Sequence, residues 1–467
     1  DSVRNALPEK FRNHKLVIYA DGKLIDNLVP HYYDPKHTSK AFTYKSGSPL
    51  ITRVSELSRP TKGLQNRHIA LWQSHGRFYD NGSGKWSWQR PPLFQTIEDM
   101  FTQSFVLPYL VPMLENAGAY VILPRERDTQ VNEVIADFDV IDEAYGTAYY
   151  KESGKWKDGG AGFAAMKPYY TGIENPFTTG SVRVADCEMY GSKTKVEAQW
   201  RPEIPERGEY AVYISYKSLP KSTSTAHYTV HHLGGKNEFI VDQKMGGGTW
   251  IYLGTFEFDK GSEGYVTLSG TTPAGYEHEK GSVVTADAVR FGGGMGNIAR
   301  GKRNSEEGPK TSGLPRSAEG ARYWLQWAGV DPEIFSQNEL TNDYRDDFMS
   351  RGDWVEWISR GSEMNPSKKE GKRIPVDLSL GFHSDAGVTP NDSIVGTLAI
   401  YTLKSEGKTT LPNGESRMNS REYADLVQSQ IVNDLRAEYD SLWNRRCIWD
   451  RSYRESRTPS APAMLLE

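Results

Sequence analysis

Two apolar stretches that lie far apart in the chain each end on a histidine, and this pattern restricts the fold more than any other feature. Residues 67–74 lead into His75, and residues 374–382 lead into His383. Short apolar runs of this kind are typical of buried strands. A helical pattern that begins near Pro91 follows the first run and has Glu98 in its early turns. The sequence therefore predicts an α/β sheet that presents these three side chains at two strand ends and a helix start.

The chemistry of these three residues indicates a metal ion. Two neutral imidazoles and one carboxylate leave a fourth position on Zn²⁺ for water, which is the arrangement of a catalytic zinc site rather than a structural one. Each residue type taken singly is more often structural, so the prediction depends on their order and surroundings. We expect His75, Glu98 and His383 to hold one zinc ion in a metal-dependent hydrolase.

The helix that carries Glu98 is predicted to run from Pro91 to about Ala117. Glu98 would lie at the edge of its buried face, and two internal prolines should kink it. The prolines are Pro108 and Pro112, and the apolar positions of the predicted buried face are Ile97, Phe101, Phe105 and Met113.

The motifs around the three residues occur in the order found in one enzyme family. They are His75-Gly76, then Glu98, then VILPRERD at residues 121–128, LGFHSDA at residues 380–386 and PAMLLE at residues 462–467. In this order the chain resembles the zinc-dependent N-acetylmuramoyl-L-alanine amidases, which cleave peptidoglycan. The resemblance implies zinc as cofactor and a phosphorylase-like α/β amidase fold, with a mixed sheet flanked by helices.

The same resemblance implies roles for individual residues. His75, Glu98 and His383 would be the metal ligands, and Glu467 the general base that passes the proton of water to the departing amine. Arg125 and Asp385 lie in the family's motifs and would bind substrate.

This chain departs from the family pattern at two places. The family has Asp-x-Gly before its first His-Gly, whereas this chain has Trp72-Gln73-Ser74. A carboxylate that orients His75 must therefore come from elsewhere. Asp385 stands where asparagine is frequent, which bears on substrate preference.

The spacing between the second and third ligands predicts an inserted domain. Glu98 and His383 are 285 residues apart (383 − 98), far more than one helix and one strand require. Residues 134–291 contain short alternating runs rich in β-branched and aromatic residues, separated by turn residues, which predict an all-β sandwich. Motifs such as AQWRP at 198–202 and GTWIYLG at 248–254 resemble the golvesin C-terminal-like domain, which also occurs beside xanthan lyases as a presumed carbohydrate-binding unit.

The predicted organisation therefore has four parts. Residues 1–133 form the first part of the catalytic domain with an N-terminal extension, and residues 134–291 form the inserted sandwich. Residues 292–320 are a Gly/Ser/Lys-rich linker, and residues 321–467 complete the catalytic domain.

Composition excludes some partners. A net charge of −4 and a pI near 6.3 provide no basic field for nucleic acid, and no apolar run of about 18 residues exists that could span a membrane. Two cysteines do not make a disulfide framework, so we expect Cys187 and Cys447 to be unpaired.

Cell-wall chemistry, taken from the resemblance, implies a periplasmic or extracellular protein whose signal peptide is absent from this chain, with peptidoglycan or another glycan as its partner.

A serine triad is excluded because His383, Ser384 and Asp385 are consecutive, and neighbouring strand residues point to opposite faces. Two alternatives to the amidase remain open. A polysaccharide lyase of the xanthan-lyase kind, or a non-catalytic cell-surface glycan-binding protein, agrees with the predicted insert and with the high aromatic content. About one zinc per chain would favour the amidase over both.

Overall fold

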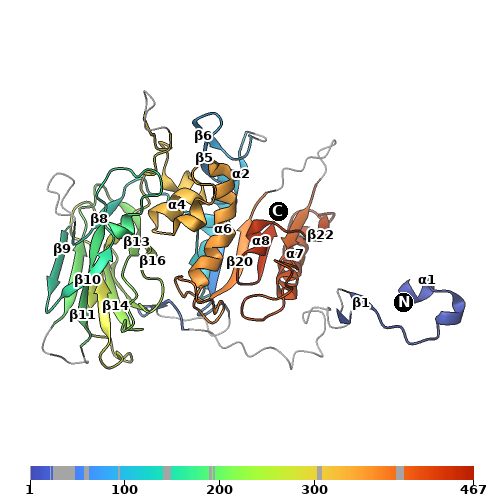
Figure 1. Ribbon diagram of the computed structural model, residues 1–467, viewed down its shortest axis with the longest axis horizontal. Coiled ribbons are helices and arrows are strands. Elements are labelled where there is room, and N and C mark those ends of the chain that lie inside the picture. Colours follow the sequence, from blue (N-terminus) through green and yellow to red (C-terminus); the bar gives the residue numbers. More distant parts are fainter. Residues whose placement is uncertain are drawn as a thin grey trace.

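The computed structural model describes residues 2–20, 23–24, 48–56, 63–92, 95–139, 149–188, 192, 195–301, 308–384 and 394–467. Its helices are α1 (Ser2–Ala6), α2 (Glu98–Phe105), a π-helical turn (Val106–Leu110), α3 (Val111–Asn116), α4 (Ala321–Trp327), α5 (Pro332–Phe335), α6 (Asp343–Ser359), α7 (Met418–Glu438) and α8 (Arg454–Arg457). β-Structure outweighs helix, and the main body has an α/β part and a sandwich part (Figure 1).

The α/β part is built on a mixed sheet of six strands. Their order is β22 (Arg445–Asp450), β21 (Thr397–Tyr401), β23 (Ala463–Leu466), β20 (Val376–Phe382), β4 (His68–Gln73) and β7 (Tyr120–Ile122). Every neighbouring pair is parallel except β21 and β23, which are antiparallel. All six residues of β4 are buried, as expected for a central strand covered on both faces.

Alternating residues of β4 point into two different cores. Ile69 and Leu71 pack with the π-helical turn, α3 and α7, whereas Ala70 and Trp72 pack with α4 and α6. Helices therefore cover both faces of the sheet, as the resemblance implied.

The sandwich part contains three sheets. Their strand orders are β3-β15-β14-β17-β12-β9, β16-β13-β19-β8 and β10-β11-β18. The strands are β3 (Ile51–Arg53), β8 (Val134–Ala136), β9 (Tyr149–Ser153), β10 (Lys157–Gly162), β11 (Gly180–Asp186), β12 (Glu197–Arg201), β13 (Gly208–Ile214), β14 (Ala226–His232), β15 (Gly235–Val241), β16 (Ile251–Phe258), β17 (Tyr265–Ser269), β18 (Val283–Ala286) and β19 (Val289–Phe291). The predicted all-β insert is present, but β3 comes from before the His75 strand and pairs with β15.

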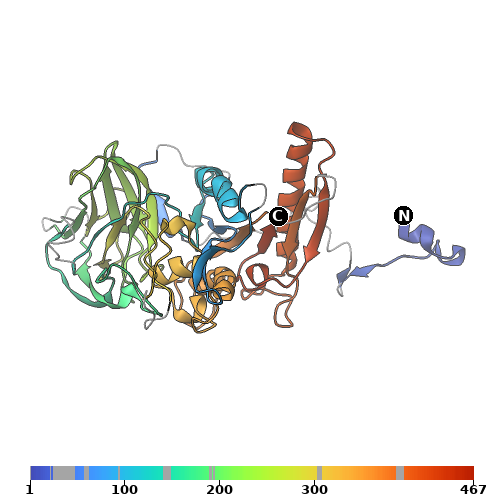
Figure 2. The same ribbon diagram turned by 90° about the horizontal axis from the view of Figure 1, so that it is seen from above.

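The sandwich and the α/β part share one aromatic core. Tyr213 and Trp250 of the sandwich belong to the same buried cluster as Trp324 and Trp327 of α4. Tyr120 of β7 also donates a hydrogen bond to the Tyr252 carbonyl, 2.9 Å away. Figure 2 shows the sandwich beside the β7 end of the sheet, with β22 at the far edge.

The predicted linker at residues 292–320 is not a free connection. Ile298, Arg316 and Glu319 are almost fully buried, and Arg316 pairs with Glu133 at 2.7 Å. The polar composition misled the prediction because Arg316 is ion-paired inside the protein and Glu319 is buried rather than solvated.

Four short strands belong to none of the sheets described above. β5 (Arg77–Asp80) and β6 (Lys85–Trp88) form a hairpin, and β1 (Tyr19–Ala20) pairs with β2 (Lys23–Leu24). α1 lies apart from the main body in both views (Figures 1 and 2). Cys187 and Cys447 are unpaired, as predicted. Within the described residues, no helix is both long and apolar enough to cross a bilayer.

Candidate metal centre

The two predicted histidines leave neighbouring strands at the same edge of the sheet. β4 and β20 are parallel, with Gln73 beside Phe382, and the Ser74 amide donates to the Phe382 carbonyl at 2.7 Å. Because both chains run the same way, His75 and His383 emerge side by side, with ring centroids 4.9 Å apart. The register of the sheet therefore creates the pair.

The turn after β4 is tightly packed, which explains the glycine that follows His75. A Cβ at Gly76 would lie 2.6 Å from the backbone carbon and oxygen of Glu319 and from the Gly320 nitrogen. A backbone obstacle cannot rotate away, so only glycine allows this approach. His75 is thereby held against the buried segment around Glu319.

Glu98 reaches the two histidines from the first turn of α2. The Ser74 hydroxyl lies 2.6 Å from the Thr102 hydroxyl, and this contact joins the helix to the strand end. The Glu98 Oε1 atom is 3.1 Å from His383 Nδ1 and 3.6 Å from His75 Nε2. The three donor atoms all lie within 4.8 Å of one another.

The buried face of this helix differs from the prediction. Phe101, Phe105 and Met113 are 43%, 44% and 65% exposed, whereas Asp99 and Thr102 are fully buried. The helix turns its polar side inward because that side contacts the strand end that carries His75. The predicted disturbance by proline does occur, since Pro108 lies inside the π-helical turn between α2 and α3.

Two of the three donor separations are close to those of ligands on a tetrahedral zinc ion. Two ligand atoms about 2.0–2.1 Å from such an ion lie roughly 3.4 Å from each other. The separations of Glu98 Oε1 from His383 Nδ1 and from His75 Nε2, 3.1 and 3.6 Å, lie on either side of that value. His75 Nε2 is buried and has no hydrogen-bond partner, so a ligand to this atom would satisfy an otherwise orphaned group.

Glu455 orients His383, and sequence reasoning missed it. Its Oε1 atom lies 3.3 Å from His383 Nε2, and it accepts hydrogen bonds from Trp72 Nε1 at 2.6 Å and Arg351 Nη1 at 2.9 Å. A carboxylate behind a ligating histidine is the usual support of a protein metal site. Trp72, near the end of β4, contributes to this support through its indole N–H.

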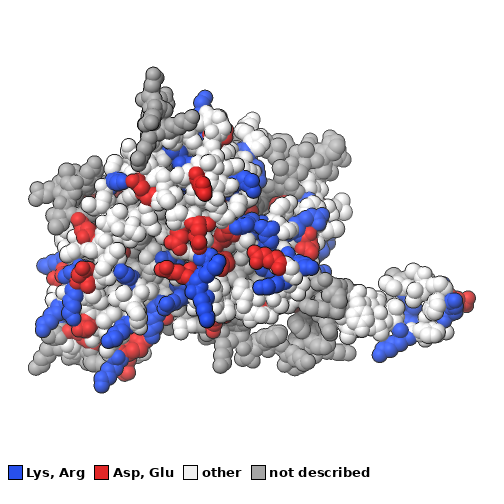
Figure 3. All heavy atoms as spheres, viewed as in Figure 1, with Lys and Arg blue, Asp and Glu red and all other residues white. Residues whose placement is uncertain are grey.

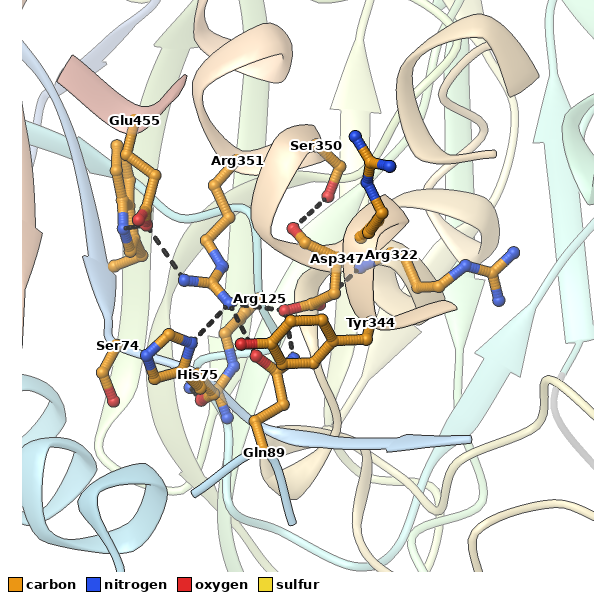
Figure 4. Close-up of polar contacts among 12 residues, drawn as sticks. Ser74, His75, Gln89, Arg125, Arg322, Tyr344, Asp347, Ser350, Arg351 and Glu455 are labelled. Carbon is orange, nitrogen blue, oxygen red and sulfur yellow. Dashed lines mark hydrogen bonds and ion pairs between the residues drawn. The ribbon is translucent and has the colours of Figure 1, made fainter. Parts of the chain in front are cut away.

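The group behind His75 is a cation rather than a carboxylate. Arg351 Nη2 lies 3.0 Å from His75 Nδ1 and 2.5 Å from Asp347, and Figure 4 shows Arg351 between His75 and Glu455. A guanidinium donates only, which favours the His75 tautomer with its proton on Nε2. A metal at Nε2 requires the proton on Nδ1, so metal binding would break this contact.

Charges around the site shift its titrations strongly. Burial lowers the pKa of His383, but the carboxylates of Glu455 and Glu98 outweigh it and raise that pKa to about 9. Burial raises the pKa of Glu455, but Arg351 and His383 outweigh it and lower that pKa to about 2. Burial, followed by Arg351, lowers the pKa of His75 well below its usual value. A proton and a metal compete for His383 Nδ1, so metal binding would release a proton.

Arg125 does not have the predicted substrate-binding position. It is 1% exposed, and it donates to the carbonyls of Gln73, His75, Ser317 and Glu319. Four backbone acceptors satisfy the guanidinium, so its role is to hold the end of β4 against the 317–319 segment. Burial lowers the pKa of Arg125 to about 10.

Of Asp385 and Glu467, the other two predicted site residues, the structure describes only Glu467. Asp385 lies outside the described residues. Leu466 pairs with Phe382, so Glu467 follows beside His383 on the adjacent strand. Its backbone is fixed by hydrogen bonds with Leu398 of 2.6 and 2.8 Å. Its role as general base stays a prediction.

Comparison with known proteins identifies the sandwich. Residues 183–293 match the golvesin C-terminal domain family. A xanthan lyase from Bacillus sp. (strain GL1) is 36% identical over 104 residues, which cover 22% of this chain. The chain spans only 10% of the length of that curated relative.

Similar solved structures cover only part of the chain. A Paenibacillus xanthan lyase aligns with 36% of this chain and 13% of its own, at 24% identity and a TM-score of 0.25. A family 35 carbohydrate-binding module from Cellvibrio japonicus aligns with 35% of this chain and 94% of its own, at 14% identity and a TM-score of 0.19.

Proposed function

We propose that this chain is a zinc-dependent hydrolase that cleaves the amide between N-acetylmuramic acid and L-alanine in peptidoglycan. The observation that carries the proposal is the convergence of His75, Glu98 and His383 at one edge of the sheet. The resemblance in motif order supplies the substrate, whereas the donor set supports only metal-assisted hydrolysis.

Each residue of the site would have its own role in the hydrolysis. His75, Glu98 and His383 would hold the zinc ion, which when bound supplies Lewis acidity and a water with a pKa lowered to about 7. Glu455 would fix the ring of His383, and Arg351 would keep Glu455 ionised. Glu467, beside His383, would accept the proton of the attacking water and pass it to the leaving amine.

The sandwich supports a polymeric carbohydrate as the partner. It matches the golvesin C-terminal domain, and the chain shares a 104-residue stretch with a xanthan lyase. We therefore propose that the sandwich holds the glycan part of the substrate and that the protein works in the periplasm or outside the cell.

The same similarity favours a second candidate, a lyase or a glycan-binding protein without catalysis. A β-elimination lyase requires a base and a group that neutralises the sugar carboxylate. Arg90, whose Nε lies 3.3 Å from Glu98 Oε2, could provide the cation. Under this alternative, His75 and His383 would act without a metal.

Metal analysis followed by digestion distinguishes the candidates. The amidase proposal requires about one zinc per chain, lost in a His75→Ala/His383→Ala double variant, and release of stem peptides that begin at L-alanine from purified peptidoglycan. Unsaturated sugar ends formed by zinc-stripped protein would support the lyase. Polymer binding without zinc or any cleavage would support the binding protein, and either result would overturn the amidase proposal.

A further inference from the structure

A large groove lies on the α/β part, away from the candidate metal centre. It has a volume of about 1340 Å³ and is bordered by α5, α6, the 405–417 loop and α8. This exceeds the roughly 300–1,000 Å³ of a pocket for a small ligand, so there is room for more than one sugar ring.

The groove and the candidate metal centre lie on opposite sides of α6 and α8, so these two helices separate them. On α6, Arg351 contacts His75, whereas Asp353 lines the groove. On α8, Glu455 contacts His383, whereas Arg454 and Arg457 line the groove. The groove is therefore a separate surface that shares its supporting helices with the metal centre.

Ion pairs neutralise only some of the charges in the groove. Arg360 pairs with Glu333 and Glu356, and Arg454 pairs with Asp353. Among the described residues, no ion pair joins the remaining basic lining residues to a carboxylate. These basic residues are Lys369, Lys408, Arg417 and Arg457, and the remaining acidic ones are Glu339 and Glu406. Because Arg360 pairs with two carboxylates, the whole lining has one more positive than negative charge (6 − 5).

Arg417 is the most unusual of the unpaired cations. It is only 5% exposed, and its Nε atom is buried without a hydrogen-bond partner. Its Nη2 atom donates to the Arg457 carbonyl at 2.9 Å, which brings two unpaired arginines together. Burial, followed by the nearby Arg457, lowers the pKa of Arg417, and the carboxylate of Glu406 opposes this only in part. An anion at this point would satisfy the free donor and the local charge.

The remaining lining favours a sugar chain over a peptide. Gln337 and Thr410 offer neutral hydrogen-bonding groups, and Ile173, which is 52% exposed, offers apolar surface to the C–H faces of sugar rings. None of the lining residues belongs to a strand, so the groove offers no sheet edge to an extended peptide. Figure 3 shows basic and acidic side chains interspersed over this side of the molecule, so the charge preference is local.

We propose that this groove binds an acidic polysaccharide strand, with sugar carboxylates received by Arg417 and Arg457. Guanidinium groups bind carboxylates through paired hydrogen bonds, which a lysine does not reproduce. The inference does not depend on the amidase proposal, because it requires neither zinc nor cleavage.

Binding of polygalacturonate oligomers to the full chain tests this inference, with the fully methyl-esterified oligomer as an uncharged match. We expect titration calorimetry to show binding of the charged oligomer only, unchanged after zinc removal. Arg457→Gln should weaken it on the order of tenfold or more. Arg457→Lys should restore only part of the affinity, and Arg417→Lys, which keeps the buried charge, should also weaken it.

The control is Arg436→Gln, which removes an exposed arginine of α7 that does not line the groove and should leave binding unchanged. Equal binding of the methyl ester, or identical affinities for Arg457→Gln, Arg417→Lys and the parent, would overturn the inference. Tighter binding of poly-L-glutamate than of polygalacturonate would also overturn it, in favour of an acidic peptide.

Discussion

Replacement of Glu455 by glutamine tests the organisation of the candidate metal centre most directly. Glu455 Oε1 accepts hydrogen bonds from Trp72 Nε1 at 2.6 Å and from Arg351 Nη1 at 2.9 Å, and it lies 3.3 Å from His383 Nε2. Glutamine keeps one acceptor oxygen and the side-chain volume but removes the negative charge. Loss of a carboxylate behind a metal-ligating histidine costs roughly 10–100-fold in metal affinity, so we expect a zinc Kd higher by that factor.

The same change should have a smaller effect on folding. Removal of one partner of a buried ion pair costs about 3–5 kcal/mol. Arg351 keeps Asp347 at 2.5 Å, and glutamine keeps an acceptor, so we expect a loss of about 1–2 kcal/mol in the free energy of unfolding.

Zinc affinity is to be measured by competition with a chromophoric chelator, and stability by urea unfolding of zinc-stripped protein. Glu356→Gln is the matched control, because Glu356 pairs with Arg360 at 2.8 Å and lines the groove instead. An unchanged zinc Kd in Glu455→Gln, with a folded protein, would refute the orienting role.

Three further changes have defined outcomes. Gly76→Ala places a Cβ 2.6 Å from the Glu319 backbone, so we expect a loss of about 1–3 kcal/mol by urea unfolding and weaker zinc binding; full stability would contradict the packing argument. Burial raises the pKa of Asp287 to about 7, above its unfolded value of about 3.8, so the folded state holds the proton more tightly and stability should fall between pH 4 and 7 by a few kcal/mol at most. Asp287→Asn should flatten that part of the pH–stability curve, and an unaltered slope would count against the raised pKa. Glu467→Gln should keep zinc while peptidoglycan hydrolysis falls by roughly 10²–10⁴, and full activity would exclude it as general base.

The sequence could predict the convergence of His75, Glu98 and His383 because parallel strands end at the same edge of a sheet. It could also predict the sandwich, since 285 residues between two ligands exceed what one helix and one strand require. Both inferences depend on periodicity and order along the chain, which are visible without coordinates.

Glu455 and Arg351 could not be found in the same way. They are distant in sequence from His75 and from each other, they lie in no recognisable motif, and only the packing of α6 against α8 brings them together. The buried face of α2 was predicted wrongly for a related reason. Apolar periodicity assumes an apolar neighbour, whereas this helix packs its Asp99 and Thr102 side against a polar strand end.

The aromatic core shared by the sandwich and α4 affects how a bound polymer would be presented. A carbohydrate module on a flexible tether samples many positions, and the tether sets only an effective concentration. Here Tyr213 and Trp250 pack in one buried cluster with Trp324 and Trp327. In addition β3, which precedes β4 in the chain, pairs with β15 of the six-stranded sandwich sheet. A polymer chain held by the sandwich would therefore meet the candidate metal centre at one distance and one orientation. The fold itself would then set which position along the polymer reaches the site.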